Sequence, residues 1–294
     1  MKTASALLLL ASAGFALGGA TSIGKKIAPP EPKVSWKSRT ISPVSNLLYF
    51  EDPVIRNEIR PAFIYHRIDD AFITGGGDAF LAGAQLRIAL TDRLQWIANK
   101  GGYLWIHPGK GADSSGWANL VTGFKYALVD SEENQFIITP GFTYEIPLGE
   151  KAIFHGTGDG ILNLFASAEK GWGDFHLTGY AGYQQAIDTD ANSSILQFNL
   201  QADYWVNQYF IPFITASSWT VLDAGNALPI DSEGYDTINF GASNSEGVTQ
   251  VTLGIGFRSR LTENIDFGVA WQKAVADPEG LFDDRFTFDI SYRW

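Results

Sequence analysis

The chain has 294 residues, no cysteine, and 32 acidic against 21 basic residues, which gives a formal net charge of −11. This acidic balance argues against a nucleic-acid partner, because phosphate binding requires clustered lysines and arginines. The absence of cysteine excludes disulfide bonds and lipid attachment at a cysteine.

The first twenty residues, MKTASALLLLASAGFALGGA, have the pattern of a secretory signal peptide. Lys2 gives a positive start, and an apolar run over residues 7–10 follows. Gly18 and Ala20 supply the small residues that favour cleavage after Ala20. The apolar run is too short to anchor the chain across a bilayer. We therefore expect residues 1–20 to be a signal peptide and the rest of the chain to be exported.

Residues 21–55 contain five prolines, which are Pro29, Pro30, Pro32, Pro43 and Pro53. Prolines at this density favour an extended or irregular segment over a helix or strand. We expect a proline-rich periplasmic segment over residues 21–55. The sequence leaves open whether this segment enters the structure that follows it.

From Ile59 onward, apolar and polar residues alternate with a period of two, which indicates β-strands with two different faces. Twelve segments, most of them about 10 to 13 residues long, follow this pattern. They cover residues 60–67, 78–90, 94–106, 117–128, 135–146, 160–170, 174–184, 195–206, 209–219, 248–260, 264–272 and 285–294. Strands in soluble proteins average about 5–6 residues and strands of membrane barrels about 9–11, so the lengths favour a barrel.

The connections between these segments alternate in length. Short connections lie at residues 91–92, 130–134, 170–173, 207–208 and 261–264. Longer ones lie at residues 69–77, 106–115, 148–158, 186–193, 220–246 and 275–283. Outer-membrane barrels have short periplasmic turns and longer outer loops, whereas a soluble sandwich has no reason to sort its loops in this way.

Tyrosines and tryptophans gather near both sets of connections, at the level where a membrane would meet water. Those near the short turns are Trp96, Tyr126, Trp172, Tyr204, Tyr209 and Trp294. Those near the long loops are Trp105, Tyr144, Trp219 and Trp271. The sequence therefore predicts an all-β fold, a transmembrane antiparallel up-and-down β-barrel of about twelve strands over residues 56–294, in the cell outer membrane. A secreted soluble β-fold is the alternative.

The last ten residues, RFTFDISYRW, place an apolar residue at every second position and end on an aromatic. The pattern resembles the assembly signal of bacterial outer-membrane barrels and consists of Phe286, Phe288, Ile290, Tyr292 and Trp294. The resemblance implies that the barrel-assembly machinery is a partner. In a closed barrel this last strand pairs with the first strand.

The other face of the strands carries charged residues, which we expect to point into the lumen because a charge facing lipid costs about 2–4 kcal/mol at the midplane. Two interpretations remain open: the charges line a pore that selects solutes, or they form ion pairs that fill a closed lumen. As pore-lining residues we predict Arg60, Arg87, Lys125, Glu145, Asp203, Arg258 and Asp289.

No motif for catalysis or metal binding has the required context. The glycine-rich stretch GTGDG precedes a strand rather than a helix, and DTDAN lacks the glycine of a calcium loop. The four histidines, His66, His107, His155 and His176, show no zinc-like spacing. We expect no enzymatic activity, no cofactor and no metal site.

The stretch GTGDGILNLFASAEKGWGDFHLTGYAGYQ (residues 156–184) resembles the putative MetA-pathway phenol-degradation family of outer-membrane barrels. The similar features are Gly-Thr-Gly before a strand, the GWGDFHL hairpin and the pair Gly182 and Tyr183. The resemblance implies a channel or transporter, similar to fatty-acid channels, for passive passage of small solutes, including hydrophobic or aromatic ones. The alternative is a closed structural or surface-interaction barrel that binds partners through its outer loops, above all residues 220–246.

Overall fold

A computed structural model describes residues 35–278 and 280–294 of the chain. The expected signal peptide, residues 1–20, and residues 21–34 of the expected proline-rich segment lie outside the described residues. Residues Ser35–Trp294 form one structural unit.

The described residues contain one β-sheet and two short 3-10 helices, η1 (Trp36–Ser38) and η2 (Lys151–Ile153). The strands are β1 (Glu58–Ile68), β2 (Gly77–Ala89), β3 (Leu94–Lys100), β4 (Gly102–Pro108), β5 (Ser114–Trp117), β6 (Leu120–Tyr126), β7 (Val129–Ser131), β8 (Phe136–Ile146), β9 (Ile161–Trp172), β10 (Phe175–Ala186), β11 (Ser194–Tyr204), β12 (Ile211–Asp223), β13 (Thr249–Arg260), β14 (Ile265–Ala274) and β15 (Asp284–Arg293). No helix among them is long and apolar enough to cross a membrane.

The sheet closes into an antiparallel barrel because β1 pairs with the strands on both sides of it. Ile59 lies opposite Leu86 of β2 and opposite Tyr292 of β15. β3 and β4 are two halves of one barrel strand and β5 to β7 are parts of another, so the barrel has twelve strands, as predicted. Closure leaves no free sheet edge, which is the condition for a β-structure to span lipid.

The two faces of the strands have opposite character, as the alternation predicts. Along β1, buried and exposed residues alternate without interruption. Phe63 and Tyr65 point outward and are 41% and 39% exposed, whereas Arg60 and His66 point inward and are buried. Outward-facing leucines, isoleucines and phenylalanines continue over the neighbouring strands. So large an apolar exterior on a closed barrel belongs in lipid, and the protein is an outer-membrane barrel.

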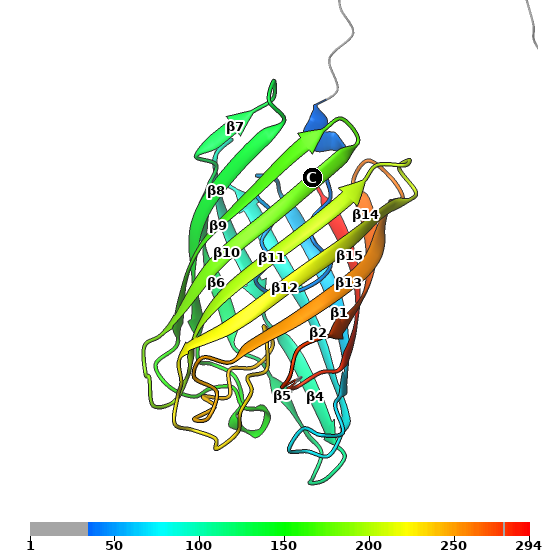
Figure 1. The fold of residues 1–294 in the computed structure, drawn as a ribbon. Coiled ribbons are helices and arrows are strands. Elements are labelled where there is room, and N and C mark those ends of the chain that lie inside the picture. Colours follow the sequence, from blue (N-terminus) through cyan, green and yellow to red (C-terminus); the bar gives the residue numbers. More distant parts are fainter. Residues whose placement is uncertain (1–34, 279) are drawn as a thin grey trace, which may run out of the picture. The chain divides into compact units, whose positions relative to one another are not determined.

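The short turns and long loops lie at opposite ends of the barrel, as predicted (Figure 1). The short turns lie at residues 90–93, 132–135, 173–174, 205–210 and 261–264. The long loops lie at residues 69–76, 109–113, 147–160, 187–193, 224–248 and 275–283. The C-terminal end lies at the short-turn end (Figure 1).

The predicted strand at residues 94–106 is divided at Gly101. β2 pairs with β3 over Leu86–Ala89 and with β4 over Gly77–Gly83, and the break lies between these two stretches. The backbones approach so closely there that a Cβ atom at Gly83 would lie 2.2 Å from the carbonyl oxygen of Gly101. Glycine permits this approach because it has no side chain, which explains why the alternation is weaker in this segment.

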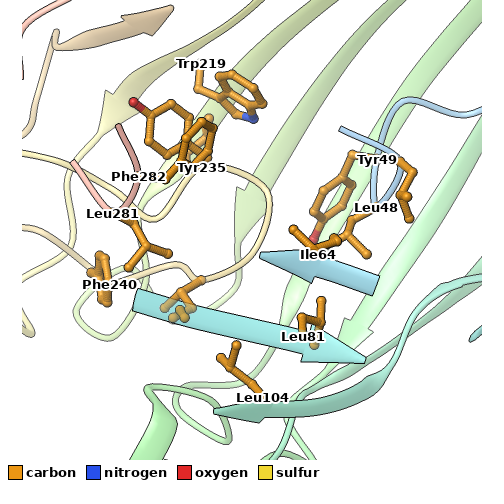
Figure 2. Packing of buried hydrophobic residues seen from close by; sticks show 14 of the residues in the cluster. Leu48, Tyr49, Ile64, Leu81, Leu104, Trp219, Tyr235, Phe240, Leu281 and Phe282 are labelled. Carbon is orange, nitrogen blue, oxygen red and sulfur yellow. The ribbon is translucent and has the colours of Figure 1, made fainter. Parts of the chain in front are cut away.

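The interior of the barrel is filled rather than open (Figure 2). Side chains of the wall, such as Ile64, Leu81 and Leu104, meet Leu48 and Tyr49 from the N-terminal part of the chain. Toward the long-loop end, residues of the outer loops join the same cluster, among them Tyr235, Phe240, Leu281 and Phe282. The barrel therefore has a packed core built from segments outside its wall.

One predicted aromatic of the long-loop end belongs to this core. Trp219 is 1% exposed and its ring lies 5.0 Å from that of Tyr235, edge to face. It shares the inward parity of Thr215 and Ser217 on β12, so its position near a loop was a poor guide to its direction. The expectation that Trp219 faces the membrane interface was wrong.

Candidate functional site

The N-terminal segment, residues 35–57, enters the barrel at the short-turn end. The backbone N–H of Trp36 donates to Glu132 in the β7–β8 turn at 2.9 Å. Arg39 pairs with Asp174 in the β9–β10 turn, with 2.6 Å between nitrogen and oxygen. From Thr40 to Val54 every residue is buried, and Figure 1 draws this part of the chain inside the barrel. The N-terminal segment therefore occupies the lumen.

The sequence left open whether the expected proline-rich segment, residues 21–55, enters the barrel, and its residues 40–54 lie inside. The segment is irregular, as its prolines predict, and residues 39–57 lie outside every strand and helix. Its place inside the barrel follows from polar side chains that meet inward-facing groups of the wall. Those contacts depend on the register of the strands, which composition does not reveal.

The N-terminal segment reverses direction at Asn46 inside the lumen. Asn46 has a φ of 52°, a left-handed conformation that asparagine adopts more readily than most residues. Its carbonyl oxygen accepts hydrogen bonds from the backbone N–H groups of Tyr49, at 3.2 Å, and Phe50, at 2.9 Å. The chain then returns to the short-turn end, where β1 begins at Glu58.

Asn46 also joins the N-terminal segment to three strands of the wall. Its side-chain oxygen accepts hydrogen bonds from Arg285 of β15 and Gln272 of β14, both at 3.0 Å. Its side-chain nitrogen donates to Ser217 of β12. A single amide thus uses both its donor and its acceptor on the wall, which holds the turn in place.

Glu51 brings together two of the predicted pore-lining residues. Arg87 donates to both of its carboxylate oxygens, at 2.8 and 2.7 Å, and Lys125 donates to one of them at 2.8 Å. Arg87 also pairs with Glu58 at 3.0 Å, and Glu58 lies 2.9 Å from Arg60. All five charged side chains are buried, so each depends on its partners for compensation.

Glu145 forms a second, separate group on the wall. It accepts hydrogen bonds from Tyr49 of the N-terminal segment at 2.5 Å and from Asn119 at 2.8 Å. Lys100 lies 3.0 Å from the same carboxylate. Asn119 interrupts the predicted strand at residues 117–128, because its side-chain oxygen also accepts from the backbone of the 147–160 loop, at Gly149 and Gly156.

The remaining predicted residues pair within the wall. Arg258 and Asp289 form a bidentate ion pair with both distances at 2.8 Å, and Asp203 lies 2.9 Å from His176. All the predicted pore-lining residues point inward and are at most 3% exposed: Arg60, Arg87, Lys125, Glu145, Asp203, Arg258 and Asp289. Opposite charges are paired in the lumen rather than separated by sign.

The sequence did not reveal the partners of these residues. Glu51 and Asp52 lie in a segment without strand periodicity, and Lys100 lies beside the break at Gly101. One signal for the contact was present in the sequence: the adjacent acids Glu51 and Asp52. The first three predicted lining residues that follow them in the chain are basic: Arg60, Arg87 and Lys125. Such a charge match suggests contact without identifying which residues meet.

The loop at residues 224–248 fills the long-loop end of the lumen. Tyr235 lies against Phe282, with ring centroids 4.2 Å apart, and Asp236 forms an ion pair with Arg285 of the wall. Arg285 also donates to Thr237 at 2.8 Å. The sequence left open whether this loop is exposed, gates the barrel or folds inward, and the structure places its central part inside.

A surface pocket of about 480 Å³ lies among the outer loops. It combines apolar and acidic side chains from three loops, among them Asp69, Phe72, Ile73, Ile230, Asp231 and Asp277.

Three potential metal ligands meet on the inner wall near the short-turn end. They are Glu169 of β9, His176 of β10 and Asp203 of β11, and each has a ligand atom within 4.8 Å of the others. No metal site was expected from the sequence, because the four histidines show no zinc-like spacing. Only the pairing of neighbouring strands brings these three residues together.

No protein-family model matches the chain, and no curated protein matches its sequence. Among solved structures, it is similar to an outer membrane channel from Pseudomonas putida F1, with 14% identity, a TM-score of 0.60, and coverage of 87% of this chain and 100% of that one. The KdgM porin shares 10% identity over 81% of this chain and 99% of that one, with a TM-score of 0.46. For the NalP translocator domain from Neisseria meningitidis the identity is 10%, the coverages are 83% and 90%, and the TM-score is 0.49. At these identities the likeness concerns the fold, which is that of bacterial outer-membrane β-barrels.

Proposed function

We propose that the protein is a gated channel for passive passage of small solutes, closed in this conformation by the N-terminal segment and the 224–248 loop. The observation that carries the proposal is the polar contact between Glu51 and two cations of the wall, Arg87 and Lys125. The segment that fills the lumen is held by hydrogen bonds and ion pairs at its centre. Water can replace such contacts when the segment moves, whereas the apolar packing of Leu48 and Tyr49 against the wall favours the closed state.

The wall remains polar once the N-terminal segment is removed. Inward-facing glutamines, asparagines, serines and threonines continue along β10 to β12, as in Thr178, Asn199, Gln201, Thr215 and Ser217. A barrel of twelve strands lies between those that side chains fill and the wide porins, so withdrawal of the segment leaves room for a narrow passage.

Withdrawal of Glu51 leaves Arg87 and Lys125 facing the passage, with Glu58 on β1 as the nearest remaining acid at Arg87. We therefore expect the open state to prefer anions over cations. Among the seven predicted lining residues, Arg87 and Lys125 are those that most directly determine selectivity in this proposal.

For the natural solutes, hydrophobic or aromatic molecules are the class that we propose. The resemblance of residues 156–184 supports this class, and so do Phe72, Ile73 and Ile230 in the outer pocket. Asp69, Asp231 and Asp277 in the same pocket disfavour a negative charge on the solute at the point of entry. Uncharged aromatic molecules fit both observations.

A closed structural or surface-interaction barrel is the second candidate. The burial of all seven predicted lining residues supports it, because the lumen is then a permanent core. The two candidates differ in whether the N-terminal segment moves, and a reversible tether tests this directly.

Ser45 of the N-terminal segment and Thr215 of β12 have their hydroxyl oxygens 3.2 Å apart, so the double variant Ser45→Cys/Thr215→Cys can form a disulfide. The chain has no cysteine of its own to compete. We expect conductance steps across a planar bilayer from the reduced variant and none from the oxidised variant.

The matched control is Thr220→Cys/Thr249→Cys, whose hydroxyl oxygens lie 2.9 Å apart on the neighbouring wall strands β12 and β13. This disulfide leaves the N-terminal segment free to move, so the conductance of the control variant should be the same in its reduced and oxidised forms. If the reduced tether variant and a deletion of residues 36–50 both fold and both remain silent, the closed barrel is the better description.

We also infer that the barrel-assembly machinery recognises β15. Phe286, Phe288, Ile290 and Tyr292 all face outward and are 38–50% exposed, so a protein that binds the outer face of this strand can reach them. Replacing Phe288 by serine should lower the amount of folded barrel in the outer membrane, as heat-modifiable mobility in gel electrophoresis would reveal.

A further inference from the structure

We propose that Glu169, His176 and Asp203 bind a divalent transition-metal ion, with Zn²⁺ as the best match. The three side chains come from the adjacent strands β9, β10 and β11 and share the inward face of the wall near the short-turn end. The proposal does not depend on whether the barrel conducts.

The pairing register places the three residues together. His176 lies directly opposite Asp203 on β11 and opposite Gly171 on β9, and Glu169 lies opposite Thr178, two residues further along β10. Directly opposite residues have Cβ atoms about 5 Å apart, and diagonal neighbours on the same face remain within reach of long side chains. Glu169 therefore reaches His176 and Asp203 from the neighbouring strand.

The distances suit a common ion. One ligand atom from each of the three residues lies within 4.8 Å of the others, and Nδ1 of His176 and Oδ1 of Asp203, 2.9 Å apart, share a hydrogen bond that an ion would replace. Two ligands of one Zn²⁺ ion, each bound at about 2.0–2.1 Å, stand roughly 3.0–3.4 Å from each other. Because the three ligand atoms lie within 4.8 Å of one another, binding requires the side chains to draw together around the ion.

Each of the three side chains has a buried atom without a hydrogen-bond partner. These atoms are Oε1 of Glu169, Nε2 of His176 and Oδ2 of Asp203, and the residues are 1%, 0% and 2% exposed. Buried polar atoms in folded proteins nearly always have partners, so these three atoms are available to bind an ion, with the imidazole offering either of its nitrogens as the ligand. Two carboxylates beside an imidazole point to a cation.

The ligand set selects among the cations. Ca²⁺ and Mg²⁺ prefer oxygen ligands, whereas an imidazole nitrogen favours Zn²⁺ and other transition metals. One nitrogen and two carboxylate oxygens leave a position for water in a four-coordinate zinc site.

The N-terminal segment covers the cluster. The ring of Trp36 lies 6.3 Å from that of His176 and is 6% exposed. Gly171 permits this approach, because a Cβ atom at that position would lie 3.0 Å from the indole. An apolar cover limits the access of water to a metal site and strengthens its electrostatic interactions.

The first test is a titration of the purified, folded chain after treatment with a chelator. Isothermal titration calorimetry with Zn²⁺, and visible absorption with Co²⁺ as a spectroscopic substitute, should each report one ion per chain. Anomalous diffraction at the zinc edge should place the ion between Glu169, His176 and Asp203. Failure of the folded wild-type chain to bind either ion stoichiometrically overturns the proposal, whatever the variants do.

The variants locate the site. His176→Gln and Glu169→Gln should each weaken binding by about 100-fold or more, since the loss of even a supporting contact costs 10–100-fold. His107→Gln is the matched control, because His107 forms a similar pair with Asp78 at 2.9 Å but is exposed. Unchanged affinity in folded His176→Gln and Glu169→Gln would contradict the assignment. If these variants do not fold, the anomalous signal of the wild-type chain decides.

Discussion

Glu51 joins the N-terminal segment to the wall through two cations at once. In Glu51→Gln, Arg87 keeps Glu58, but Lys125 loses its carboxylate and keeps only backbone oxygens of the N-terminal segment as partners. A buried cation without its partner typically costs about 3–5 kcal/mol. We expect a lower free energy of unfolding in urea and more frequent opening in planar bilayers.

The control for this prediction is Asp174→Asn, which breaks the pair between Asp174 and Arg39 at the short-turn end. Both side chains are more than 40% exposed, and an exposed pair contributes only about 0–1 kcal/mol. If Glu51→Gln changes stability and opening no more than this control does, Glu51 does not hold the segment in place.

His155 in the 147–160 loop makes the stability of the barrel depend on pH. Burial and the nearby Lys100 lower the pKa of His155 to about 3, and its Nδ1 accepts a hydrogen bond from the backbone of Asn119 at 3.1 Å. The unfolded chain takes up a proton near pH 6.5, but the folded chain does not, so this contribution to stability is complete above pH 6.5 and decreases as pH falls toward 3.

At pH 5 we expect the free energy of unfolding to be lower by about 2 kcal/mol. This pH lies about 1.5 units below the ordinary histidine pKa, and each unit corresponds to about 1.4 kcal/mol. His155→Asn retains an acceptor for the Asn119 N–H but does not titrate. Urea unfolding in lipid vesicles at pH 7.5 and pH 5 should therefore reveal a larger loss in the wild-type chain than in this variant. Equal losses would mean that His155 is not responsible.

At the level of elements, the 224–248 loop is held inside the barrel by the ring of Tyr235. Tyr235→Ala removes the contacts with Trp219 and Phe282, and truncation of a buried aromatic costs about 3–5 kcal/mol. We expect the loop to leave the lumen and become sensitive to protease from the outside, while the barrel stays folded.

Limited proteolysis of intact cells or vesicles, followed by gel mobility with and without heating, measures both effects. Tyr209→Ala in the short turn at residues 205–210 is the control, because Tyr209 is 60% exposed. Protection of the loop in Tyr235→Ala would indicate that the ion pair between Asp236 and Arg285 is sufficient to retain it.

Across the whole molecule, the apolar exterior faces lipid, so a charge placed on it should destabilise the barrel most near the middle of the bilayer. Leu200, near the middle of β11, is 48% exposed, and Leu200→Arg should destabilise the barrel by about 2–4 kcal/mol. Tyr204→Arg at the end of the same strand should cost only about 0–1 kcal/mol. Urea unfolding in vesicles compares the two, and equal costs would argue that β11 does not span the bilayer as described.

The barrel itself could be predicted from sequence because its determinants are local. A closed sheet in lipid requires an apolar residue at every second position, and segments such as 196–204 display this requirement directly. The lengths of the turns could be predicted in the same way, because each strand ends where the alternation stops and the residues between two strands form the turn. The inward direction of Arg87, Lys125 and Asp289 could be derived from the same parity.

The state of the lumen could not be predicted, because it depends on contacts between residues distant in sequence. Glu51 lacks any periodic pattern that would place it beside Arg87 and Lys125, and Trp219 was misassigned since parity outweighs nearness to a loop. Glu169, His176 and Asp203 meet only through the pairing of three strands. Alternation along one strand is set by the lipid on one side of it, whereas register and ion pairing are set by the neighbours in the folded barrel, and only the tertiary structure specifies them.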